Sequence, residues 1–128
     1  MIEQLRPGAS AERARVVLFD FDGTLSVIRS GWVDVMVPMM VEILADLKSG
    51  ESEQQLTAIV KEFVGRLTGK QTIYQMIELR DHVRRRGGNP GDPVEYKHMY
   101  LERLWEGIKD RVQELKDERC PPEKYLVP

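Results

Sequence analysis

The sequence has 128 residues, of which 41% are hydrophobic and 31% are charged, and this length suffices for one small domain. The formal net charge is −2 and no apolar stretch reaches the ~20 residues of a membrane span, so we expect neither nucleic acid nor a membrane as partner. The single cysteine, Cys120, excludes an internal disulfide bond and fits a reducing cytosol, so we expect a cytoplasmic protein.

The first predicted element is the apolar run Val16–Phe19, which ends in two carboxylates and a glycine. Such a continuous run is typical of a short strand that is buried on both faces, as in a parallel sheet. In open α/β sheets the chemistry lies at the carboxyl ends of the strands. Because side chains alternate along a strand, Asp20 and Asp22 would project in the same direction, and Gly23 would permit a sharp turn.

Asp20 and Asp22 form a candidate site for metal-assisted chemistry. Two carboxylates this close repel each other, and a hard cation such as Mg²⁺ would offset the repulsion and leave room for a substrate phosphate. One carboxylate could attack phosphorus while the other handles the proton of the leaving group. The alternative is an ordinary turn, since Asp and Gly are common turn residues. The apolar run directly before Asp-x-Asp-Gly-Thr favours the functional interpretation.

The segment Asp20–Leu25 resembles the first motif of the haloacid dehalogenase-like (HAD) phosphohydrolases. The resemblance implies that Asp20 is the nucleophile, forms an aspartyl-phosphate and binds Mg²⁺. It implies that Asp22 is the general acid and base and that its backbone carbonyl also contacts the metal. An aspartate at the second position of the motif is typical of the family's phosphatases and not of its dehalogenases. We also place Gly23 and Thr24 among the candidate substrate-binding residues.

Two helices are predicted after this motif. The first runs from about Trp32 to Lys48, and Pro38 either kinks it or marks its true start. We expect Trp32 to pack in the core rather than to contact substrate. The segment Ser52–Gln55 has the form of a capping box and begins the second helix. Apolar residues in that helix recur at three- and four-residue spacing and predict one buried face: Leu56, Ile59, Val60, Phe63, Val64 and Leu67.

The loop formed by Gly69, Lys70 and Gln71 is the second candidate part of the site. In HAD members with a helical cap, a glycine-bearing loop between two cap helices closes over the substrate, and this loop looks similar. Lys70 would then contact a substrate phosphate or hydroxyl, which suits a flexible point charge. The alternative is a solvated loop between two helices.

Two more helices complete the predicted set. The third is expected over residues 72–85, with Thr72 and Gln75 forming a capping box. The fourth is expected over residues 93–116, with Asp92 as its cap and a proline in the first helical position.

We divide the chain into three parts: residues 1–30 as an N-terminal piece of a HAD core, 31–118 as a helical cap, and 119–128 as a linker that returns to the core. Only one strand is predicted, and a parallel strand needs neighbours for its backbone groups. The chain is therefore expected to be mostly α-helical, within a parent protein that has a Rossmann-type α/β core. The resemblance implies that a Ser or Thr, a Lys and a second acidic pair come from missing sequence, so that this chain is incomplete and inactive alone.

The sequence thus predicts a Mg²⁺-dependent phosphatase with a helical cap that acts on a small phosphorylated metabolite. Two alternatives stay open. One is a non-enzymatic helical interaction module, in which the Asp pair is only a structural corner. The other is a phosphotransferase or phosphomutase of the same family, which passes the phosphoryl group to a sugar instead of to water.

Overall fold

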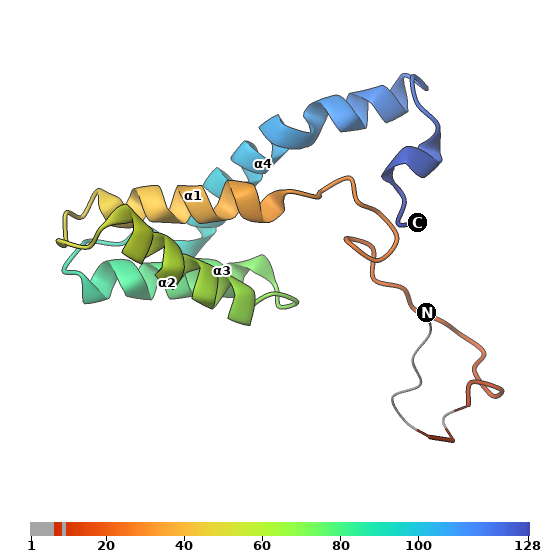
Figure 1. Ribbon diagram of the computed structural model, residues 1–128, viewed down its shortest axis with the longest axis horizontal. Coiled ribbons are helices and arrows are strands. Elements are labelled where there is room, and N and C mark those ends of the chain that lie inside the picture. Colours follow the sequence, from red (N-terminus) through yellow and green to blue (C-terminus); the bar gives the residue numbers. More distant parts are fainter. Residues whose placement is uncertain (1–6, 9) are drawn as a thin grey trace.

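The structure, a computed structural model, describes residues 7–8 and 10–128. This part of the chain contains four α-helices and one short 3-10 helix: α1 (Trp32–Ala45), α2 (Glu53–Arg66), α3 (Thr72–Arg85), α4 (Pro93–Lys116) and η1 (Pro122–Tyr125). The mostly helical chain predicted from the sequence is confirmed. Figure 1 shows the helices gathered in one bundle, from which the second half of α4 projects. No helix among the described residues is both long enough and apolar enough to cross a membrane.

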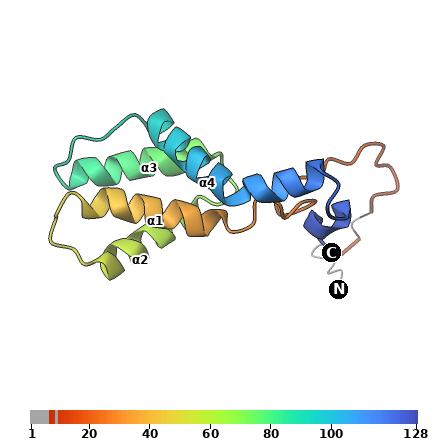
Figure 2. The same cartoon turned by 90° about the horizontal axis from the view of Figure 1, so that it is seen from above.

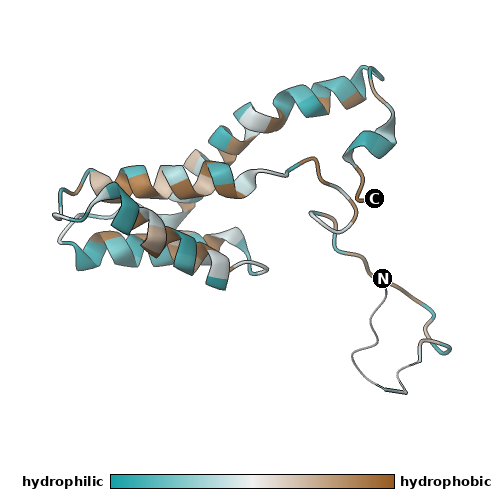
Figure 3. Ribbon diagram, viewed as in Figure 1, coloured by the Kyte–Doolittle hydropathy of each residue, from teal (hydrophilic) through white to brown (hydrophobic). Residues whose placement is uncertain are grey.

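Helix α1 lies at the centre of the bundle. It packs against α2, α3 and α4, and Figure 2 shows it between α2 and α3. Hydrophobic residues follow its whole length in Figure 3, and the buried ones are Met36, Val37, Met39, Met40, Val41 and Leu44. Pro38 lies inside the helix and is not its start, and the helix ends at Ala45 rather than at the predicted Lys48. Helix α1 therefore supplies the part of the core that the other helices share.

Two of the predicted helix caps are confirmed. At the start of α2, the Gln55 amide donates to Ser52 Oγ at 3.2 Å, and the Ser52 amide donates to Gln55 Oε1 at 2.8 Å. At the start of α4, Asp92 and Glu95 form the equivalent reciprocal pair. Each box satisfies amide donors that have no partner inside the helix, so local sequence alone sets these two starts.

The predicted capping box of α3 is wrong. Gln71 occupies the cap position and makes no side-chain capping bond. Gln75 is only 3% exposed and turns inward, where its Nε2 donates to the carbonyl oxygen of Val64 at 3.4 Å. The Gln75 side chain thus contacts α2 and is not available for a capping box at the start of α3.

The predicted strand Val16–Phe19 does not form within the described residues. Its four side chains are 76, 64, 92 and 67% exposed, and its backbone has no strand partner there. The pairing found in the described chain is limited to isolated bridges of Ser26 with Asp22 and with Leu126. A strand is stable only when neighbours satisfy its backbone groups, and this part of the chain offers none to the apolar run.

The end of the chain returns to the segment that precedes α1. The Val27 amide donates to the Tyr125 carbonyl at 2.8 Å, and the Val127 amide donates to the Leu25 carbonyl at 3.1 Å. Figure 1 accordingly shows the C-terminus beside the orange segment before α1. The predicted return linker contains the 3-10 helix η1.

An ion pair joins the α1–α2 connection to the end of α3. Arg86 Nε and Nη2 donate to the two carboxylate oxygens of Glu51 at 2.6 and 2.7 Å. Arg86 Nη1 also donates to the carbonyl oxygen of His82 at 3.1 Å, and the His82 ring stacks on Phe63. The hydrogen bonds from Arg86, and then from Ser49, lower the pKa of Glu51 from 4.5 to about 2.

We predict that Glu51→Gln makes stability less dependent on acid pH. Because the pKa of Glu51 is lower in the folded state, its contribution is present above about pH 4.5 and is lost as the pH falls towards 2. The variant should melt at a lower temperature than the native protein at pH 7, and the difference should shrink between pH 4.5 and 2. Melting curves across this range test it, with the exposed Glu102→Gln as control. A difference that does not change with pH would contradict the assignment.

We predict that Phe63→Ala destabilises the fold by about 3–5 kcal/mol, because it removes a large side chain from a site with no exposure. Urea unfolding measures the loss. Tyr74→Ala is the matched control, since Tyr74 is 51% exposed on α3 and its removal should change stability by about 0.5 kcal/mol or less. Equal losses of stability in Phe63→Ala and Tyr74→Ala would contradict the burial of Phe63 in the core.

Candidate functional site

Residues 20–26 form a compact turn before α1. The Phe21 carbonyl oxygen accepts the amides of Leu25 and Ser26, each at 2.9 Å, and the Gly23 amide donates to the Ser26 carbonyl oxygen at 2.8 Å. Gly23 has a φ of 78°, a left-handed conformation that strains any residue with a Cβ. The glycine of the motif is therefore required by the backbone itself.

The two carboxylates of the turn have different partners. Thr24 Oγ1 donates to Asp20 Oδ2 at 3.3 Å, which is a long hydrogen bond. Arg29 Nη1 forms an ion pair with Asp22 Oδ2 at 2.8 Å. The side chains of this pair are 38% and 46% exposed, so water screens it and it holds Asp22 only weakly.

Two candidate parts of the site that are remote in sequence meet at one pocket of about 410 Å³. Asp20 and Asp22 line it from the turn, and Gly69 and Lys70 line it from the α2–α3 loop. Figure 1 shows this loop at the end of the bundle that faces the N-terminal segment. The volume falls within the range of roughly 300–1,000 Å³ that is usual for small-molecule sites.

The other predicted site residues have supporting positions. Gly23 and Thr24 do not line the pocket but build the turn that carries the carboxylates. Gln71 does not line it either and occupies the cap position of α3. Trp32 packs against the core, as predicted, and also forms part of the pocket wall.

Six lining residues were not predicted: Arg29, Met36, Thr68, Thr72, Gln75 and Tyr100. Gln75 and Tyr100 are 3% and 2% exposed, so polar groups reach the pocket from buried helix positions. The sequence signal for Tyr100 was its four-residue spacing from Tyr96 and Leu104, which marks the inner face of α4. No local pattern indicated Arg29, because its partner is set by the fold of the turn.

Two buried residues that line the pocket, Gln75 and Tyr100, are polar but uncharged. Burial raises the pKa of the Tyr100 hydroxyl, and the nearby Arg29 guanidinium opposes that rise. The hydroxyl is therefore protonated at neutral pH. Together with the Gln75 amide it gives the pocket neutral hydrogen-bonding groups opposite the charged turn.

Asp20 and Asp22 are the two carboxylates that line the pocket. Mg²⁺ is usually held by one or two carboxylates, with water and phosphate oxygens completing the coordination. Asp20 and Asp22 supply that share at the pocket. Within the described part of the chain, no three His, Cys, Asp or Glu side chains are grouped to hold a metal ion. An ion at the pair would therefore depend on oxygen ligands from other sources.

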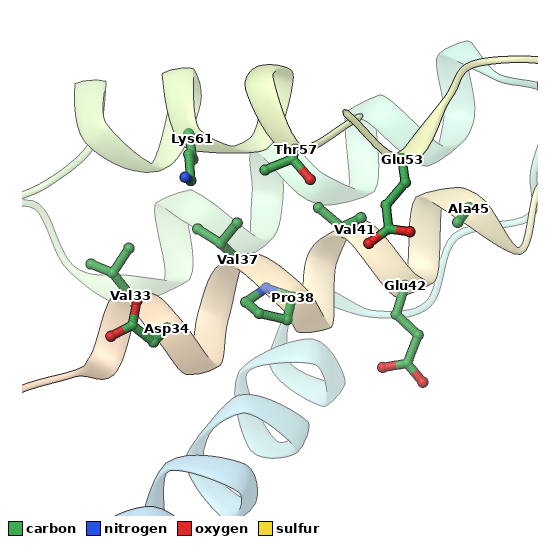
Figure 4. Close-up of a pocket in the computed structure, with 10 residues that line it drawn as sticks. All are labelled: Val33, Asp34, Val37, Pro38, Val41, Glu42, Ala45, Glu53, Thr57 and Lys61. Atoms are coloured by element: carbon green, nitrogen blue, oxygen red, sulfur yellow. The ribbon is translucent and has the colours of Figure 1, made fainter. Parts of the chain in front are cut away.

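A larger pocket of about 540 Å³ lies between α1 and α2 (Figure 4). Its walls include Val37 and Val41 of α1, and its opposite side includes Lys61 of α2. Figure 4 shows Asp34 at one end and Glu42 towards the other, so these acids do not converge. Glu42 also pairs with an arginine of α4. Because it has no acid pair on a glycine turn, we place the candidate site at the smaller pocket.

Comparisons with known proteins add no assignment: the chain matches no family model, no curated protein and no solved structure. The resemblance of Asp20–Leu25 to the HAD motif therefore stays a prediction from sequence.

We predict opposite effects on stability for two glycine substitutions, one in α2 and one in the loop that follows it. Gly69→Ala should destabilise by about 1 kcal/mol or more, because Gly69 has a φ of 88°. Gly65→Ala should stabilise by up to about 1 kcal/mol, because Gly65 lies inside α2, where alanine is the better helix former. Neither added methyl group meets an atom within 4 Å, so urea unfolding of the two variants isolates the backbone effect. Effects of the same sign would rule out the left-handed loop.

Proposed function

We propose that this chain is part of a Mg²⁺-dependent phosphomonoester hydrolase of the HAD-like type, which acts on a small phosphorylated metabolite. The observation that supports the proposal most is the shared pocket, where Asp20 and Asp22 lie together with Gly69 and Lys70. A nucleophile, an acid and a cation from a separate loop are the parts that phosphoryl transfer requires near one another.

The roles of the two carboxylates are those that the resemblance to the HAD motif implies. Asp20, which has a hydroxyl as partner, attacks phosphorus, and the bond from phosphorus to the leaving oxygen breaks. Asp22 donates its proton to that oxygen. Asp22 then takes a proton from water, which attacks phosphorus in the aspartyl-phosphate, releases phosphate and restores Asp20. A Mg²⁺ ion held by the Asp20 carboxylate and, as the resemblance implies, by the backbone carbonyl of Asp22 would offset the negative charge of carboxylate and phosphate.

The helical part of the chain serves as a cap in this proposal. The α2–α3 loop carries Lys70 to the edge of the pocket, where its flexible side chain reaches an anionic substrate. Gly69 gives this loop its left-handed bend. Closure of such a loop over the substrate would exclude water from the reacting groups.

The exposed run Val16–Phe19 supports the further proposal of a parent protein with a Rossmann-type α/β core. Four apolar residues in a row are costly to leave in water and are typical of a central parallel strand. Further strands would cover the run and place a Ser or Thr, a Lys and a second acidic pair beside Asp20. Without those groups we expect the chain alone to be nearly inactive.

We predict that the full-length protein, meaning this chain with any further sequence encoded alongside it, hydrolyses small phosphomonoesters only when Mg²⁺ is present. Asp20→Asn should reduce activity to background, because the amide is not a nucleophile. Asp22→Asn should lower kcat about 10²–10⁴-fold, the usual contribution of a general acid. Release of inorganic phosphate from a substrate panel, with and without EDTA, measures both effects.

Asp34→Asn is the matched control, since Asp34 lines the other pocket, and its activity should equal that of the native protein. Unchanged activity in Asp20→Asn would contradict the mechanism. A full-length protein without activity on any phosphoester, but with Mg²⁺-independent binding of a protein partner, would favour the interaction module. A phosphorylated sugar as product, in place of free phosphate, would favour the phosphotransferase.

A further inference from the structure

Arg29 is the one arginine among the residues that line the pocket. Its Nη1 lies 2.8 Å from Asp22 Oδ2, in an ion pair that is about half exposed. An exposed pair of this kind is held weakly and is readily exchanged for a better partner. A phosphate offers such a partner, because its oxygens accept two parallel hydrogen bonds from one guanidinium group.

Arg111 on α4 fixes the backbone on both sides of Arg29. Its Nη1 donates to the carbonyl oxygen of Ile28 at 2.8 Å and to that of Ser30 at 2.9 Å. Among the described residues Arg111 forms no ion pair with a carboxylate, so its hydrogen bonds go to this backbone. These hydrogen bonds join the second half of α4 to the residues that lead from the turn into α1.

The same residues are also held from the C-terminal segment. The Val27 amide donates to the Tyr125 carbonyl oxygen at 2.8 Å. Arg29 therefore projects into the pocket from a backbone that is fixed on one side by α4 and on the other by the returning chain. Tyr100 lies close enough to Arg29 for the guanidinium to affect its ionisation. The position of Arg29 is thus set by two other segments, α4 and the returning C-terminal chain.

We propose that Arg29 is an anion-binding residue that leaves Asp22 for an oxygen of the substrate phosphate, and that Arg111 is the positioning residue that aims it. This inference rests on the proposed function, and it adds a reason why the acid is paired in the free protein. While Arg29 is paired with Asp22, the Asp22 carboxylate is held in that ion pair. When phosphate takes the guanidinium, the Asp22 carboxylate is released from the ion pair.

The test measures binding of inorganic phosphate to the full-length protein in Mg²⁺, at constant ionic strength, by calorimetric titration. Arg29→Gln should weaken binding by about tenfold or more, the loss expected for one hydrogen bond between charged groups. Arg29→Lys should bind more tightly than Arg29→Gln but less tightly than the native protein, since lysine keeps the positive charge but not the two parallel donors of the guanidinium group. Arg111→Gln should weaken binding to an intermediate degree, and Arg111→Lys should recover part of that loss.

Arg103→Gln is the matched control: Arg103 also lies on α4 and pairs with Glu42, away from the pocket, so phosphate affinity should not change. Melting temperatures separate positioning from general stability. An Arg111→Gln protein that melts earlier but binds phosphate as tightly as the native protein would overturn the role of Arg111. Native phosphate affinity in Arg29→Gln, or no binding by the native protein, would overturn the role of Arg29.

The two proposals fail in different ways. Phosphate binding that depends on Arg29, in a protein without hydrolytic activity, would remove the phosphatase but keep the anion site. Hydrolysis with a phosphate affinity that does not depend on Arg29 would keep the phosphatase and remove the anion site. In an active protein, Arg29→Gln should raise KM for the phosphoester, because it removes a group that binds the phosphate.

Discussion

The burial of α1 against the three other helices is the constraint on which the rest of the structure depends. The helix begins at Trp32, directly after Gly31, whose φ of 87° turns the chain sharply into the bundle. Because α1 cannot shift along its axis without disturbing the core, the turn that carries Asp20 and Asp22 stays near its first residues. The α2–α3 loop lies at the same end of the bundle, so core packing places the two halves of the pocket together.

Sequence patterns predicted those parts of the fold whose causes are local. The reciprocal boxes at Ser52 and Asp92 act within four residues, and they formed as predicted. The box at Thr72 failed because a distant carbonyl on α2 accepts the hydrogen bond of Gln75. The strand over residues 16–19 failed for a similar reason, because its pairing depends on other segments and none of the described ones provides it. Local propensity sufficed only where no remote partner competed.

The candidate site shows the same division. The motif itself indicated Asp20 and Asp22, and the glycine loop indicated Lys70, and all three line one pocket. Arg29 could not be predicted, because the arginine lies seven residues after its partner across an irregular turn. The result is a pocket edge with two acids and two basic groups, whose charges balance. A neutral pocket of this kind attracts an anion mainly after a cation has bound the acids.

The exposed run of apolar side chains before the turn has a consequence for how the protein behaves in solution. An uncharged, β-prone segment in water is a template for pairing with the same segment of another molecule, which leads to aggregation. Arg15 and Asp20 flank the run and act as charged gatekeepers against such stacking. Asp20 thus also contributes to solubility, since its replacement by a neutral residue removes a solubilising charge together with the carboxylate. The Asp20→Asn variant should form oligomers at a lower protein concentration than the native chain.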